Sequence, residues 1–182
     1  MHQNHCIAEA ISKVEQTPLN QLLSSGKCNK FQWSTFLHNQ RACHIALESR
    51  KIITQQELMR TGRLSQDLSK MGFNCQCPNL PLAEITQSYV TYVSEIEVPK
   101  LWAHIYVRYL IDIGTSSPIK VSINHPSINL NFDNTDECLS YIREHMIDID
   151  ENEMDSALQW ILQGYNQIFE IVSKNSINRL TA

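Results

Sequence analysis

Three titratable side chains follow one another at intervals of one helical turn in the segment AHIYVRYLID: His104, Arg108 and Asp112. Residues four apart share one face of a helix, so a base, a cation and a carboxylate would line up there. Groups of these types can exchange protons when they face one cavity. The same spacing is also typical of a helix ion pair or of a hydrogen-bonded core histidine that has no function. The residues alone leave both interpretations open.

Cysteines and acidic residues are the next candidates, as metal ligands. The six cysteines are scattered, and we expect them to be reduced: Cys6, Cys28, Cys43, Cys75, Cys77 and Cys138. Cys75 and Cys77 lie close together in CQCP, but a zinc site needs two more ligands, and none is at a suitable spacing. A di-iron site needs Glu-x-x-His spacing, whereas Glu144 and His145 are adjacent and diverge on a helix. No metal site is therefore expected.

The composition is ordinary for a globular protein, and it argues against several functions. The 182 residues include 42% hydrophobic and 19% charged side chains, with a net charge of −4. Neither this charge nor any local run supplies the basic stripe of a protein that binds nucleic acid or a membrane surface. No apolar run approaches the ~18 residues that span a bilayer, and MHQNHCIAEA lacks the pattern of a secretory signal. We expect a single domain over residues 1–182, located in the cytoplasm.

Apolar residues recur at helical spacing along most of the chain. The first apolar face comprises Ile7, Ala10, Ile11 and Val14. Thr17-Pro18 is typical of an N-cap followed by proline at the first helical position, and Gly26 of a C-cap. Further helices are predicted over residues 29–53, 54–71, 82–96, 99–113, 133–146 and from 150 onward. The pattern predicts an all-α, single-domain bundle of seven or eight helices.

Two capping boxes and one irregular segment complete this prediction. Thr54 with Glu57, and Asp150 with Glu153, have the spacing in which two side chains cap a helix start. The stretch PIKVSINHPSINLNF alternates and is rich in Ser, Asn and Pro. Residues 114–133 are therefore expected to form an extended loop or one short strand pair.

Five segments, taken in order, resemble the heme oxygenase family: VEQTPLNQLLSSG, FLHNQRACHIALES, ELMRTGRLSQDL, QSYVTYV and AHIYVRYLIDIGTSS. The last is similar to the family's distal-helix signature, in which Ala-His-x-Tyr-x-Arg-Tyr precedes Gly-Asp-Leu-Ser-Gly-Gly. The resemblance runs from Ala10 to Asp112 and continues more weakly through the last helix. It implies a heme oxygenase-like fold, in which heme lies between a proximal helix with an iron-ligating His and a kinked distal helix.

The resemblance breaks at the residue that should ligate iron. Counting back from Glu15, the family's His falls at Ile11, whose side chain cannot bind a metal. His5 repeats the His-x-x-x-Glu spacing, but it lies six residues upstream of Ile11, about 240° around a helix and about 9 Å along it. Using His5 would require the first helix to slip, whereas the match after Ala10 needs no shift.

The distal helix departs from the family as well. The first signature Gly is Ile111, and the later pair is Thr115 and Ser116. Glycine lets the backbone approach a ligand closely, so branched side chains here would place methyl groups where the heme plane should pass. Gly114 could restore some of the kink, one residue out of register.

The polar positions of the family's site match this sequence better than its His and Gly positions do. By this resemblance, the catalytic network corresponds to Tyr89, Arg108, Asp112 and His44. Asp112 matches the family's carboxylate that organises water, and His44 is at a position where the family usually has Tyr. On the cofactor side, Tyr106 matches the signature and Arg143 matches a residue that pairs with a heme propionate, whereas its usual basic companion is Leu139.

Three hypotheses follow. The leading one is a heme oxygenase-like protein that has lost standard heme ligation at Ile11 and Ile111, has no expected cofactor, and binds a small apolar ligand or acts as an interaction protein. The alternative is a divergent active enzyme that cleaves heme to biliverdin, carbon monoxide and iron, with His5 or another axial ligand. A third is a protein for a bilin or another tetrapyrrole, which needs no iron bond.

Overall fold

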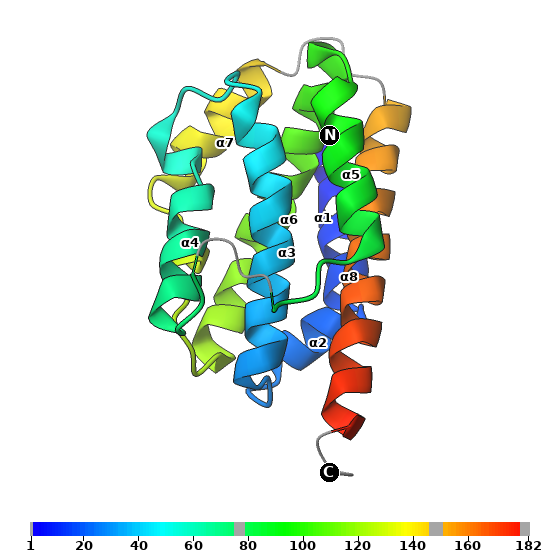
Figure 1. Cartoon of the computed structure of the whole chain (residues 1–182). Coiled ribbons are helices and arrows are strands. Elements are labelled where there is room, and N and C mark those ends of the chain that lie inside the picture. Colours follow the sequence, from blue (N-terminus) through cyan, green and yellow to red (C-terminus); the bar gives the residue numbers. More distant parts are fainter. Residues whose placement is uncertain (1, 75–78, 146–150, 179–182) are drawn as a thin grey trace.

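The computed structural model describes residues 2–74, 79–145 and 151–178, with side chains for 8–74, 79–145 and 151–174. Within these ranges the chain forms eight α-helices and two short 3-10 helices, with no strand (Figure 1). The α-helices are α1 (His2–Glu15), α2 (Pro18–Ser24), α3 (Lys30–Ser49), α4 (Thr61–Lys70), α5 (Glu84–Glu95), α6 (Val98–Ser122), α7 (Thr135–Glu144) and α8 (Glu151–Asn178). The 3-10 helices are η1 (Gln56–Leu58) and η2 (Ile128–Leu130). The predicted all-α class is confirmed.

Helix α6 is the central element of the bundle. Every residue from Leu101 to Ile111 is buried, including its polar members. A helix that is buried on all sides must be surrounded by other elements, and α6 packs against α1, α2, α7 and α8. Helix α3 packs in turn against α4, α5 and α8. Side chains of α3 and α6 meet between these helices, at His44 with Asp112 and at Gln40 with Arg108, and Figure 1 shows α3 in front of α6.

Local signals set the first helix boundaries as the sequence predicts. Thr17 Oγ1 accepts a hydrogen bond from the backbone N–H of Asn20 (3.3 Å), and Pro18 is the first residue of α2. Gly26 follows the end of α2 with φ of +72°, a conformation that favours glycine. These features place α2 across the end of α1 and return the chain into α3.

The predicted capping box of Thr54 and Glu57 is wrong. Thr54 instead meets the hydroxyl of Tyr141, with both its N–H and its Oγ1 at 3.1 Å, and α4 begins only at Thr61. The start of α4 is capped from another helix: Glu48 Oε1 of α3 accepts hydrogen bonds from the backbone N–H groups of Arg60 (2.7 Å) and Thr61 (3.0 Å). A cap from a distant residue leaves no local pattern to recognise.

The predicted loop or strand pair over residues 114–133 is also wrong in its first part. Helix α6 continues to Ser122 through Pro118, which has no N–H to donate to the carbonyl of Gly114. Burial of Thr115 and Ile119 keeps this stretch helical despite the lost hydrogen bond. The rest is a loop with η2, which the Asp67 carboxylate fixes by accepting hydrogen bonds from two backbone N–H groups at 2.9 and 2.8 Å.

Two predictions fall outside the described residues: the close pair Cys75 and Cys77, and Asp150 of the second capping box. Its partner Glu153 lies in the first turn of α8 and binds other helices, as set out below. None of the helices in the described ranges has both the length and the apolar character that crossing a membrane requires.

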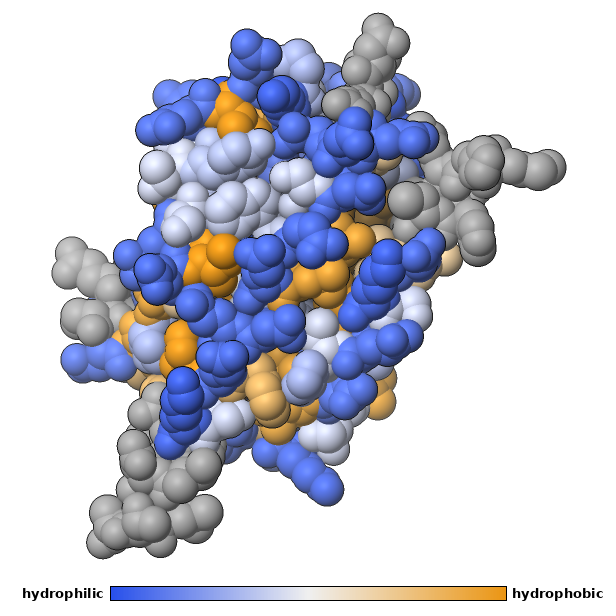
Figure 2. Space-filling view, turned by 90° about the vertical axis from the view of Figure 1, so that its right-hand side faces the viewer, coloured by the Kyte–Doolittle hydropathy of each residue, from blue (hydrophilic) through white to orange (hydrophobic). Residues whose placement is uncertain are grey.

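Apolar side chains are dispersed over the surface. On the face in Figure 2, which is the right-hand side of Figure 1, hydrophilic side chains separate the apolar areas from one another. Among the described residues, the large apolar side chains that are exposed are Ile45, Val98 and Val121. They lie on α3 and at opposite ends of α6, so they do not form one patch.

Candidate functional site

Ile11 of α1 lies directly on the backbone of Gly114 in α6. A Cβ atom placed on Gly114 would be 2.6 Å from Cδ1, 3.0 Å from Cγ1 and 3.2 Å from Cγ2 of Ile11. The side chain therefore occupies the space that the missing glycine side chain leaves. A flat macrocycle needs about 3.5 Å on each of its faces, or about 7 Å between the atoms on either side. No such gap separates α1 from α6 at this point.

The other substituted positions of the distal helix are also filled. Ile111, Thr115 and Ser116 are all buried. The hydroxyls of Thr115 and Ser116 donate to carbonyls of α6 itself, those of Ile111 and Ile113, each at 2.8 Å. These hydroxyls are satisfied within the helix and leave no polar group free for a ligand.

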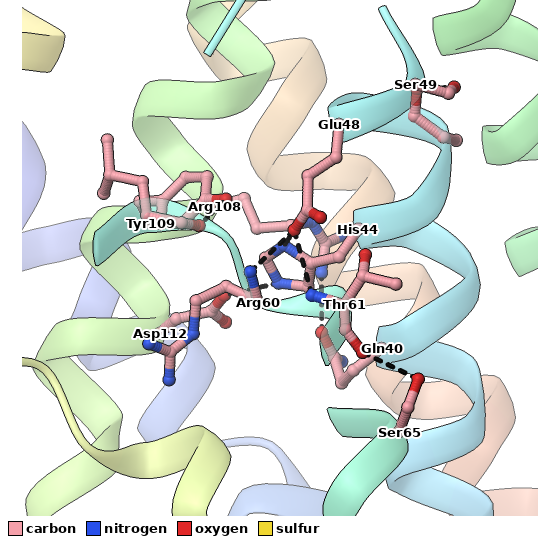
Figure 3. Close-up of polar contacts among 12 residues, drawn as sticks. Gln40, His44, Glu48, Ser49, Arg60, Thr61, Ser65, Arg108, Tyr109 and Asp112 are labelled. Carbon is pink, nitrogen blue, oxygen red and sulfur yellow. Dashed lines mark hydrogen bonds and ion pairs between the residues drawn. The ribbon is translucent and has the colours of Figure 1, made fainter. Parts of the chain in front are cut away.

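A hydrogen bond between His44 and Asp112 joins α3 to α6 beside this contact. His44 Nε2 lies 3.0 Å from Asp112 Oδ2, and His44 Nδ1 lies 4.0 Å from Glu48 Oε1 (Figure 3). His44 is 2% exposed, whereas the carboxylates are partly exposed at 18% and 13%. The imidazole of His44 therefore lies between the two carboxylates, one on α6 and one on α3 itself.

Arg60 adds a buried positive charge to this region, and no motif in the sequence marks it. Its side chain is buried, Nη1 donates to the carbonyl of Asn131 at 3.0 Å, and the guanidinium lies 3.9 Å from the centroid of the Phe132 ring. Burial lowers the pKa of Arg60 to about 10, and nearby Asp112 opposes that change. Arg60 stays positively charged at neutral pH and balances one of the two acids.

Arg108 lies one helical turn before Asp112 on α6 and contacts Gln40 of α3, one turn before His44. Its Nη1 donates to Gln40 Oε1 at 2.8 Å, and its guanidinium lies 5.2 Å from the centroid of the Tyr89 ring. Burial raises the pKa of Tyr89 to about 12, so this ring is neutral beside the cation. Among the described residues, Arg108 and Asp112 form no ion pair with each other although they are four residues apart. The predicted network is thus two adjacent clusters, linked through α3.

The remaining predicted residues lie elsewhere. Tyr106 is buried in α6, whereas Arg143 is exposed on α7. His104 is fully buried in a separate cluster, in which Glu153 Oε1 lies 3.0 Å from His104 Nε2 and accepts a hydrogen bond from Tyr92 at 2.8 Å. The side chain of His5 is outside the described residues. His104 therefore belongs to a different cluster from His44 and Asp112.

Two small cavities adjoin the clusters. One of about 20 Å³ (the space open to the centre of a water molecule) touches His44, Arg60 and Asp112. The other, of about 10 Å³, touches Tyr89 and Arg108. Each has room for about one or two water molecules. Within the described part of the chain, no three His, Cys, Asp or Glu side chains are grouped as metal ligands would be.

Comparison with known proteins bears on the fold. Neither the family models nor the curated protein sequences gave a match to this chain. Among solved structures, it is similar to heme oxygenase-1 from the cyanobacterium Synechocystis sp. PCC6803 in complex with heme, with a TM-score of 0.74. The chain has the heme oxygenase fold. The similarity covers 95% of each chain at 19% sequence identity.

A likeness at this identity establishes the heme oxygenase fold and leaves the chemistry to the residues. In this fold Ile11 lies against Gly114 of α6, and His44 lies beside Asp112. Sequence reasoning missed Glu48, Arg60 and Gln40, which complete the charge and hydrogen bonds of the two clusters. Glu48 stands in the ALES segment of α3, but only its tertiary contacts distinguish it from an ordinary surface acid.

Proposed function

We propose that this chain is a heme oxygenase-fold protein that does not ligate heme through its first helix and acts as a ligand-binding or interaction protein. The contact between Ile11 and Gly114 carries this proposal, since Cδ1 of Ile11 comes within 2.6 Å of a Cβ built on the glycine. Ile11 has no donor atom for iron, and it fills the place where a macrocycle would have to pass. The residues present therefore do not fit heme.

The buried charges support a binding role for the interior. His44, Asp112 and Arg60 surround one small cavity, and Arg108 adjoins another. Buried charged groups with adjoining space are costly to keep in a protein that does nothing with them. The dispersed apolar side chains on the surface in Figure 2 favour a small ligand over a large apolar protein partner.

The first test is a titration of the purified protein with hemin, followed by absorption. We expect no sharp Soret band of a His-ligated complex, because no imidazole is available at Ile11. Ile11→His tests the same position from the other direction: if the wild-type protein binds hemin stoichiometrically and this variant binds it identically, Ile11 does not mark a lost ligand and the proposal is wrong.

A divergent active enzyme is the second candidate, and the 3.0 Å contact of His44 with Asp112 favours it, since a carboxylate is kept where the family has one. This candidate requires that heme be converted to biliverdin, carbon monoxide and iron when an electron donor is supplied. His5→Ala should then abolish binding and turnover. Turnover by the wild-type protein would overturn our proposal, and its absence together with a spectral shift of added biliverdin would identify a bilin as the ligand.

A further inference from the structure

A narrow crevice between α3, α5 and α8 leads to the guanidinium of Arg108. Besides Arg108, its lining includes Gln40 and Cys43 of α3, Thr86 and Tyr89 of α5, and Gly164 and Tyr165 of α8. Arg108 is the only charged side chain in this lining, and no acid contributes to it. Burial raises the pKa of the Cys43 thiol and of the Tyr89 and Tyr165 hydroxyls, so these groups are neutral at physiological pH.

Among the described residues, no carboxylate lies within ion-pair distance of the Arg108 guanidinium, and Asp112 acts on it only from farther away. The side chain is 4% exposed, its Nη1 donates to the neutral oxygen of Gln40, and its Nε has no hydrogen-bond partner. Asp112 lines the other cavity, where it contacts His44. A buried cation with an unused N–H group is stabilised by an anion that accepts from it.

Glycine on α8 provides the space beside this cation. A Cβ atom added to Gly164 would meet no heavy atom within 4 Å, in contrast to Gly114. The space open to the centre of a water molecule is about 10 Å³, which suits a monoatomic or few-atom occupant. The hydroxyls of Thr86 and Tyr165 line the same space and can donate hydrogen bonds. Size, charge and donor groups all match a small anion.

We propose that this crevice binds a small monovalent anion, of the size of chloride or formate, on the guanidinium of Arg108 next to Gly164. Gln40 and Tyr165 line both cavities and so separate the anion from the carboxylate of Asp112. This site is independent of the α1–α6 contact at Ile11. The outcome of a hemin titration therefore does not decide it.

The test is thermal unfolding at constant ionic strength, with sodium chloride or sodium formate replacing sodium gluconate, whose anion is too bulky for the crevice. A ligand that binds only the folded state raises the unfolding midpoint along a saturable curve. We expect such a curve for the wild-type protein. A midpoint that does not depend on the anion, or that rises without saturation, would overturn the proposal.

Three variants distinguish the crevice from the rest of the surface. Arg108→Met should remove the saturable rise, and Gly164→Leu should remove it while the cation is kept, because the new side chain fills the crevice. Lys100→Met is the matched control: it removes a positive charge from the same helix at an exposed position and should keep the full rise. An identical rise in Arg108→Met and in the wild-type protein would refute the site.

A crystallographic measurement needs no variant. Wild-type crystals soaked in sodium bromide should show an anomalous peak within hydrogen-bond distance of the Arg108 guanidinium. Ordinary water density at this place, with no anomalous signal, would show that the crevice is merely hydrated and would overturn the proposal.

Discussion

At the scale of single residues, the contact of Ile11 with Gly114 decides how α1 meets α6. Gly114→Ala adds a Cβ 2.6 Å from Ile11 Cδ1 and 3.0 Å from its Cγ1, so a rotation of the end of the side chain cannot relieve the contact. Gly164→Ala is the matched control in a helix interior with open space. We expect Gly114→Ala to be less stable than Gly164→Ala by about 1–3 kcal/mol, because overpacking offsets the gain in helix propensity.

Urea unfolding measures both variants, and a double variant identifies the cause. Ile11→Ala combined with Gly114→Ala should recover part of the loss, since the two side chains then share the space. Equal free energies of unfolding for Gly114→Ala and Gly164→Ala would mean that α1 can shift away from α6 without loss of stability. The filled slot would then no longer argue against a macrocycle.

Asp112 is the residue whose loss should disturb the buried charges most. Its carboxylate contacts His44 and lies near the buried Arg60. Asp112→Asn should lower the free energy of unfolding by about 1–3 kcal/mol, because His44 loses the carboxylate that it contacts and the buried Arg60 loses a nearby anion. Asp133→Asn, at an exposed ion pair with Arg63, should change it by about 0.5 kcal/mol or less. Similar losses for the two variants would contradict the importance of the buried cluster.

The sequence could predict some of these residues and not others, for physical reasons. One helix carries His104, Arg108 and Asp112, so their position on a common face could be predicted from their spacing in the sequence. Glu48 and Arg60 become neighbours only because α3 and α4 pack together, and the backbone N–H of Arg60 is capped from α3. The predicted cap at Thr54 was wrong for the same reason: Thr54 binds Tyr141, which is distant in sequence, instead of Glu57.

At the scale of elements, Glu153 ties the start of α8 to α5 and α6. Its Oε1 accepts a hydrogen bond from the hydroxyl of Tyr92 and lies 3.0 Å from Nε2 of the fully buried His104. Burial lowers the pKa of His104, and the hydrogen bond to Glu153 only partly opposes this. The rings of Tyr89 and Tyr92 also face His104. The folded state therefore prefers neutral His104 more than the unfolded state does.

Because the folded state prefers neutral His104, the free energy of unfolding should decrease as the pH falls. Above the unfolded pKa of about 6.5, His104 is neutral in both states and has no effect on stability. As the pH falls below that value, the unfolded chain takes up the proton first, so the free energy of unfolding decreases. His104→Gln should flatten this decrease, measured by urea unfolding between about pH 7.5 and about pH 5.5. Part of the slope should remain, because burial and Arg41 lower the pKa of His38 as well. An unchanged slope in His104→Gln would contradict this assignment.

At the scale of elements, the C-terminal part of α6 is a helix that the pattern of apolar residues did not predict. Residues 114–122 contain Gly, Pro and several small polar residues, which are typical of loops, yet the helix passes through them. Their helical state depends on burial of Thr115, Ser116 and Ile119 against neighbours that are remote in sequence. A local pattern contains no information about such neighbours. The helices with clear apolar faces and local caps, such as α2 and α3, were predictable for the opposite reason.

At the scale of the whole molecule, the order of the helices was predictable because five segments resemble one family in the same order. The function was less predictable, since one fold can carry different functions. The central helix explains both facts. It packs against α1, α2, α7 and α8, and Ile111, Thr115 and Ser116 are buried in it at positions where the family signature has glycine. Substitutions of buried residues of similar kind can leave the packing of helices unchanged and still change what a fold binds.

The same central position predicts that residues 1–182 unfold as one cooperative unit. Buried apolar residues of α1 to α8 belong to a single cluster, and α6 contributes to it along most of its length. Removing one outer helix would expose α6 to water, so no helix can leave without cost to the others. Differential scanning calorimetry should give a ratio of calorimetric to van't Hoff enthalpy near unity. A separate early transition that a truncation of α7 abolishes would show instead that the chain contains two cooperative units, with the His44–Asp112 cluster in the more stable one.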